Sequence, residues 1–145
     1  MSRSILLASI AALTLAAPVV AHADATDPQA CSVTVEYSLN NVLRLSYQKD
    51  FVVAVDAPFS DDFSTATRFR FFDAFLTVED GVPLVSIAFD ADVSVFNAVA
   101  FGAELKVTDP RHGSSTSGNS GFFTSVPGAA GSHRTAYTLT CQRAN

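Results

Sequence analysis

The sequence predicts an all-β, single-domain protein: an antiparallel β-sandwich or small β-barrel of about 7 to 8 strands. Apolar and polar residues alternate along most of the chain, as they do in strands that bury one face. Turn residues recur at intervals of roughly 8 to 12 residues, and the helical spacing of about 3.6 residues is nearly absent. The length of 145 residues allows one domain with a real core.

Three strands are expected in the first part of the chain. Apolar positions alternate over residues 31–37, and Asn40 and Asn41 then offer a turn because asparagine tolerates positive φ. A second alternating segment covers residues 43–47, and Lys49 and Asp50 are expected to interrupt it. Residues 51–57 are apolar on both faces except at one position, which predicts a central strand covered on both sides.

Later segments follow the same logic. The apolar set changes phase near Phe71 and Phe72, which indicates either a β-bulge or a strand with both faces partly buried. The bulge is the preferred interpretation, because it lets the neighbouring charged residues reach water. Asp80 and Gly81, between two apolar segments, give the strongest hairpin signal in the chain, a turn that needs positive φ at both residues. Further alternation predicts strands at residues 85–89, 99–107 and 135–141, and a short strand at Val93 and Val95.

The N-terminal segment, residues 1–23, has the pattern of a secretory signal peptide. Arg3 precedes an apolar run, and the small residues Ala21 and Ala23 stand before Asp24. The expected organisation is a signal peptide at 1–23, a short lead-in at 24–30 and a β domain at 31–145. We therefore expect a secreted or periplasmic protein with no integral membrane segment after cleavage.

The charge balance excludes one class of partner. Without Arg3 the expected mature chain carries 8 basic and 14 acidic residues, a formal charge of −6. Nucleic acids bind through a basic surface field, so no nucleic-acid partner is expected.

The two cysteines, Cys31 and Cys141, stand near the two ends of the expected mature chain. An even number of cysteines in an oxidising compartment predicts a disulfide. Free thiols or a metal pair are the alternatives, but no close-spaced pair of ligands accompanies either cysteine. The sequence therefore predicts that a Cys31–Cys141 bond closes the domain.

Residues 110–132 are rich in glycine and serine, and the sequence predicts one long, flexible loop there that contacts a partner. Asp109, His112 and His133 border this segment. If the loop's two ends met, the histidines and the carboxylate would be candidate metal ligands or hydrolase residues. No catalytic motif surrounds them, so we assign no catalytic residue and expect no cofactor.

Twelve phenylalanines and no tryptophan are the one compositional oddity. Phe59 and Phe63 bracket an acidic segment, and Phe122 and Phe123 lie in the glycine-rich one, so these four are candidate contacts for a partner or ligand. The leading interpretation is a non-catalytic binding module for another protein. One alternative is a carrier that holds a small apolar ligand in a phenylalanine-lined cavity. Another is a hydrolase or metalloenzyme that uses His112 and His133.

Overall fold

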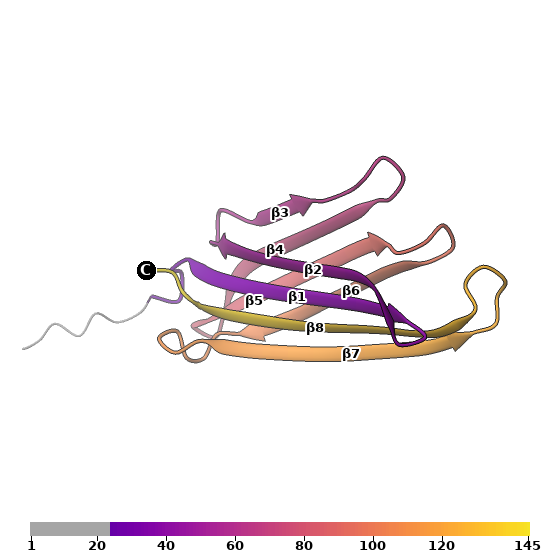
Figure 1. The fold of residues 1–145 in the computed structure, drawn as a ribbon. Coiled ribbons are helices and arrows are strands. Elements are labelled where there is room, and N and C mark those ends of the chain that lie inside the picture. The colour runs from indigo at the N-terminus through magenta and orange to yellow at the C-terminus, as the bar shows by residue number, and fades with distance from the viewer. Residues whose placement is uncertain (1–23) are drawn as a thin grey trace, which may run out of the picture.

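The protein is a β-sandwich of two four-stranded antiparallel sheets (Figure 1). The computed structural model describes residues 24–145, so the predicted signal peptide lies outside the described residues. The sheets have the strand orders β2-β1-β8-β7 and β3-β4-β5-β6, and they do not close into a barrel. The strands are β1 (Gln29–Leu39), β2 (Val42–Val53), β3 (Phe59–Asp62), β4 (Arg70–Glu79), β5 (Val82–Asp92), β6 (Ala98–Lys106), β7 (Ser114–Thr124) and β8 (Gly131–Arg143). None of residues 24–145 belongs to a helix that is long and apolar enough to cross a membrane.

Both turns predicted from residue type are confirmed. Asn40 and Asn41 connect β1 to β2 with φ values of 52° and 63°. Asp80 and Gly81 connect β4 to β5 with φ values of 52° and 77°. Positive φ at both central residues gives a two-residue turn whose twist matches that of the strands it joins.

Aromatic rings fill the space between the sheets, which accounts for the phenylalanine content. The two largest fully buried side chains are Phe72 and Phe89. Neighbouring rings from both sheets lie at centroid distances of 4.4 to 5.9 Å, a range in which aromatic pairs attract. The series runs through Phe59, Phe51, Phe72, Tyr47, Phe63, Phe89, Phe101 and Tyr137.

β2 continues through Lys49 and Asp50, so the interruption predicted there is wrong. Asp50 faces solvent on the outer side of the strand, while the Lys49 Nζ reaches an Asp61 carboxylate oxygen of β3 at 3.1 Å. The central strand predicted at residues 51–57 is also wrong, because residues 51–53 end β2, which is an edge strand.

The β-bulge predicted near Phe71 and Phe72 is wrong as well. β4 pairs with β5 from Arg70 to Glu79 without a change of register. Phe72 is buried in the core, whereas Phe71 lies half-buried on the other face of the sheet, stacked on Phe69 with ring centroids 6.3 Å apart. Partial burial of both faces, the alternative to the bulge, therefore accounts for the apparent change of phase.

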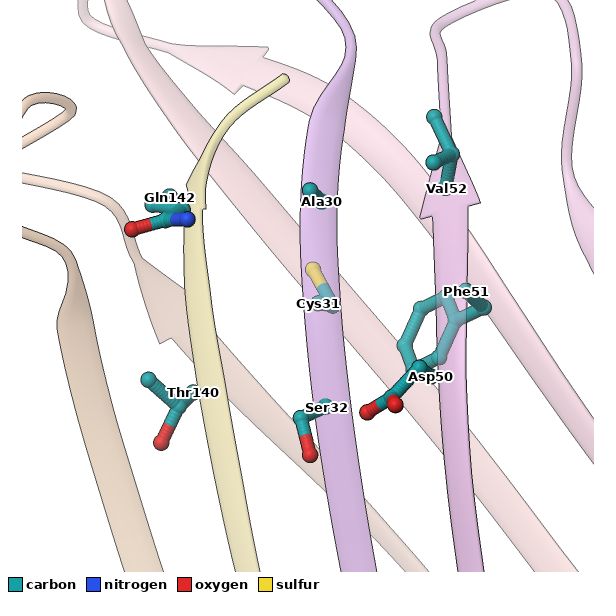
Figure 2. A pocket seen from close by; sticks show the side chains of 8 residues that line it. All are labelled: Ala30, Cys31, Ser32, Asp50, Phe51, Val52, Thr140 and Gln142. Carbon is teal, nitrogen blue, oxygen red and sulfur yellow. The ribbon is translucent and has the colours of Figure 1, made fainter. Parts of the chain in front are cut away.

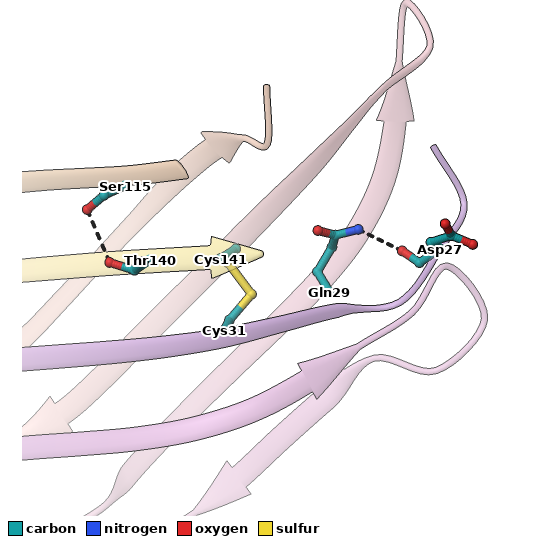
Figure 3. The surroundings of a disulfide bond; sticks show 6 residues. All are labelled: Asp27, Gln29, Cys31, Ser115, Thr140 and Cys141. Carbon is teal, nitrogen blue, oxygen red and sulfur yellow. Dashed lines mark hydrogen bonds between the residues drawn. A yellow bond between two sulfur atoms is a disulfide. The ribbon is translucent and has the colours of Figure 1, made fainter. Parts of the chain in front are cut away.

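The predicted disulfide is confirmed: Cys31 and Cys141 are bonded and are direct register partners on β1 and β8 (Figure 3). Both strands lie in the middle of their sheet, and both cysteines are buried in the core. The bond joins the first and last strands of the fold, 110 positions apart in the chain.

The long flexible loop predicted at residues 110–132 is wrong, because its middle forms the eleven-residue strand β7. β7 pairs with β8 along its whole length, and Gly118 stands opposite Tyr137. A Cβ atom at Gly118 would lie 2.5 Å from the Tyr137 ring, which in turn stacks on Phe101 of β6. The small residues here therefore make room for a packed aromatic ring.

Gly118→Ala is expected to lower the free energy of unfolding by about 1 to 3 kcal/mol, because the added methyl group overpacks the Tyr137 ring. Strand and helix propensities alone would favour alanine over glycine. Urea denaturation measures the change. The neighbouring Ser117→Ala, on the exposed side of the strand, serves as the control and is expected to stay within about 0.5 kcal/mol. Equal effects of the two substitutions would contradict the packing role of Gly118.

Candidate functional site

Exposed apolar side chains gather at one end of the sandwich, at the start of β2 beside the β1–β2 turn, in the β5–β6 loop and at the end of the β7–β8 hairpin. Figure 1 shows these three connections at the same end, away from the C-terminus. They carry seven of the twelve exposed large hydrophobic residues within the described part of the chain. We call this surface the apolar end; it consists of Val42, Leu43, Val95, Phe96, Phe122, Phe123 and Val126.

Direct contacts hold the three connections together. The backbone N–H of Asn40 donates to the Ser132 carbonyl at 2.8 Å, and the Ser132 N–H donates back to the Asn40 side chain at 2.9 Å. The β5–β6 loop lies against the β7–β8 turn, because the Phe96 ring covers Gly128 so closely that a Cβ there would lie 2.6 Å from it. Gly128 has a φ of 84°, which also favours glycine.

The buried His133 side chain connects the β7–β8 turn to β1 at this end. Its Nε2 lies 2.7 Å from the Ala129 carbonyl oxygen, which can only accept a hydrogen bond. Nε2 therefore donates to Ala129, and in the neutral ring Nδ1 accepts from the Tyr37 hydroxyl at 2.7 Å. Burial raises the pKa of Tyr37, against a smaller opposing effect of Arg44, so this hydroxyl keeps its proton. His133 thereby fixes the β7–β8 turn to β1.

Two phenylalanines at the end of β7 flank this histidine. The Phe122 ring stacks on the His133 ring, with the ring centroids 4.4 Å apart and an angle of 4° between the ring planes. Phe122 nevertheless stays 59% exposed. Phe123 is the next residue and is 75% exposed. Arg134 joins both rings in lining a shallow hollow of about 360 Å³. Exposed aromatic groups beside a cation are typical of residues that anchor protein contacts.

The structure does not bring the four candidate phenylalanines together. Phe59 and Phe63 lie on the β2–β3 side of the sandwich, where they stack on Phe51 and Tyr47 with centroids 5.1 and 4.4 Å apart. They are partly buried against the core. Phe122 and Phe123 lie on β7, at the opposite edge of the first sheet. Of the four, only this second pair contributes to the apolar end.

The two histidines do not meet either. His112 lies in the turn before β7, and His133 pairs with the far end of that strand, so roughly 30 Å of strand separates them. The exposed His112 ring contacts the Asp109 carboxylate at 3.1 Å. The His112 backbone N–H, which donates to the same carboxylate, is the main cause that lowers the pKa of Asp109. Among residues 24–145 no three histidine, cysteine or acidic side chains come together as metal ligands would.

A second hollow lies on the outer face of the first sheet and is about 650 Å³ in volume (Figure 2). Small side chains at Ala30 and Ser32 form its floor, between Asp50 on β2 and Thr140 on β8. Asp50 is the one charged residue that lines it, and the Phe51 ring belongs to the core. The hollow therefore offers the exposed Val52 side chain, two hydroxyl groups, the Gln142 amide and one carboxylate, with no exposed aromatic ring.

Sequence reasoning missed two features of the apolar end. The short strand predicted at Val93 and Val95 is wrong, because these residues lie in the β5–β6 loop. Nothing local in the sequence shows that Phe96 in this loop folds against Gly128. His133 did carry a signal: it continues the alternation that buries Leu139 and Cys141 on β8, so it belongs to the buried face. No protein-family model, curated protein or solved structure matches the chain.

Proposed function

We propose that the chain is a secreted or periplasmic, non-catalytic binding module that contacts another protein through its apolar end. The observation that carries this proposal is the clustering of seven exposed apolar residues on three connections that contact one another. Exposed apolar clusters cost free energy in water and mark interaction surfaces in soluble domains. The disulfide and the pattern of residues 1–23 support an oxidising compartment outside the cytoplasm.

The chemistry of the histidines favours binding over catalysis. His133 uses both ring nitrogens in buried hydrogen bonds to Tyr37 and Ala129, so neither nitrogen faces a substrate. His112 contacts Asp109 in an exposed turn, and among the described residues its ring has no hydrogen bond to a serine or cysteine. A general base needs a nucleophile within hydrogen-bond reach, and these contacts provide none.

The apolar-carrier alternative has less support. A carrier needs an empty, apolar interior, and here stacked rings occupy the space between the sheets. The hollow lined by Phe122, Phe123 and Arg134 and the hollow at Ser32 are both open to solvent and lie on the outside of the sandwich. The apolar surface that remains available faces outward, as a protein contact requires.

Photo-cross-linking at the apolar end tests the proposal. A photoreactive amino acid at Leu43 or Val95, in protein produced by its own cell, is expected to give one discrete adduct whose mass differs from twice that of the chain. The same group at Phe75, which is 46% exposed on the outer face of β4, is the matched control and should give none. Equal adducts from all three positions, or none from Leu43 and Val95, would refute the apolar end as the contact surface.

A further inference from the structure

A two-layer sandwich has four edge strands, whose outer backbone groups can pair with another chain. Three of these edges carry features that oppose such pairing. β2 presents Lys49, which is ion-paired with Asp61 of β3, and β3 is only four residues long and includes two aspartates. β6 carries Glu104 and Lys106, and Lys106 is paired with Glu79 of β4. Short strands and charged side chains are the usual protection of a sheet edge.

β7 has none of these features. It is eleven residues long, and it is the one strand of the eight in residues 24–145 without a charged residue. It contains no proline, and all its backbone pairing is with β8. About five of its residues therefore direct an N–H and a C=O away from β8, because these groups alternate in direction along an antiparallel strand.

We propose that β7 pairs in antiparallel fashion with β7 of a second copy of this chain, so that two four-stranded sheets join into one of eight strands. The proposal goes beyond the binding function above, since it rests on the free backbone edge of β7. The two surfaces share Phe122 and Phe123, and the other five residues of the apolar end lie outside β7. The edge offers backbone donors and acceptors in a regular row, and an extended strand is the structure that satisfies such a row. A twofold axis then generates both halves of the contact from the same surface.

The side chains of β7 are self-complementary in one register. With Asn119 opposite Asn119 of the second copy, all eleven residues pair. Phe122 then stands opposite Thr116, and Phe123 opposite Ser115, so each large ring meets a small side chain. Large residues opposite small ones let paired strands pack without a clash.

Charge selects the second copy over a foreign strand. Pairing any charged strand with itself sets like charges near one another, which destabilises a sheet, and β7 is free of that penalty. A charged peptide would find no complementary charge on β7 itself. Each molecule has a net negative charge, but β7 itself has no charged residue. Two copies can therefore pair along β7 without placing like charges opposite each other.

The mass of the protein in solution tests the pairing. Sedimentation velocity is expected to show a mass that doubles as concentration rises, and Asn119→Lys should abolish the doubling because two lysines would then oppose each other. Ser46→Lys is the matched control: it adds the same charge to the same outer face, in the same cross-strand row through Ala136 and Glu36, but at the opposite edge. It is expected to leave the doubling unchanged. A wild-type protein that stays monomeric at all concentrations would overturn the proposal.

A charge-pair experiment tests the register. Asn119→Asp and Asn119→Lys should each be monomeric alone and should form a mixed dimer when combined, since only this register sets residue 119 opposite itself. A mixture that remains monomeric would overturn the proposal. Should Asn119→Lys fail to fold, Asn119→Cys gives the same answer. It is expected to form an intermolecular disulfide, because paired residues in antiparallel strands have Cα atoms about 4.5 to 5.5 Å apart, within disulfide range. Ser46→Cys should not cross-link, and equal cross-linking of the two variants would refute the β7 interface.

The two proposals fail separately. Leu43 and Val95 lie outside β7, so loss of the dimer leaves the cross-linking result at the apolar end unchanged. Likewise, the absence of cross-linking at Leu43 and Val95 would not change the mass doubling that sedimentation velocity is expected to show.

Discussion

Cys141→Ser is expected to lower the free energy of unfolding by about 4 to 5 kcal/mol, the largest effect of any substitution considered for this fold. The bond to Cys31 closes a loop across 110 positions, so its loss returns a large conformational entropy to the unfolded chain. Many domains are stable by only about 5 to 15 kcal/mol in total. We expect the melting temperature to fall by on the order of 15 °C, measured by calorimetry under non-reducing conditions.

Two controls separate the cross-link from the side chain. The double variant Cys31→Ser with Cys141→Ser should lose as much as the single variant, because both lack the same covalent bond. Ser115→Ala removes only the hydroxyl that accepts a hydrogen bond from Thr140 at 3.2 Å (Figure 3), and it should change stability by less than about 0.5 kcal/mol. A Cys141→Ser loss as small as that of Ser115→Ala would contradict the entropic role of the disulfide.

His133→Ala is expected to lower the free energy of unfolding by about 2 to 4 kcal/mol. The substitution leaves a cavity under Phe122 and removes the hydrogen-bond partners of Tyr37 and the Ala129 carbonyl, both in buried surroundings. The loss should be local as well as global. Backbone amides at Gly128 and Ala129 should exchange hydrogen faster than in the wild type, because His133 no longer fixes this turn.

His112→Ala is the matched comparison, since it removes the same side chain from an exposed turn. The His112 side chain is 83% exposed, and its contact with Asp109 lies at the surface. Its removal should change stability by less than about 0.5 kcal/mol. Urea denaturation of both variants decides the matter: equal losses would show that burial of His133 has no energetic consequence.

Strand alternation predicts the fold class because each strand lays one face against the other sheet. In β1 this gives Val33 and Val35 no exposure while their polar neighbours face outward. The turn residues Asp80 and Gly81 are equally local, since their backbone preference does not depend on distant contacts. Features that rest on neighbours in sequence could therefore be predicted.

The errors arise where a distant partner decides the structure. Lys49 remains within β2 because its ammonium group forms an ion pair with the Asp61 carboxylate of the other sheet. The small size of Gly118 reflects the Tyr137 ring above it and not flexibility of the chain. The same limit applies to the apolar end, whose loops come together only after the sheets pack and Phe96 covers Gly128. Extending the alternation of β8 by one more position would have placed His133 on the buried face, but its hydrogen bond to Tyr37 depends on the pairing of β8 with β1.

The position of the disulfide also determines how the protein would respond to mechanical force. β1 and β8 are neighbouring antiparallel strands, and the start of β1 lies beside the end of β8. Tension applied to the two ends of the chain would therefore break the hydrogen bonds between these strands one after another. The Cys31–Cys141 bond stands at the third residue of β1 and the third from the end of β8, and it would stop this opening almost at once. The force would then pass directly from one terminus to the other through the two sulfur atoms. The sandwich, including β7 and the apolar end, would carry no load.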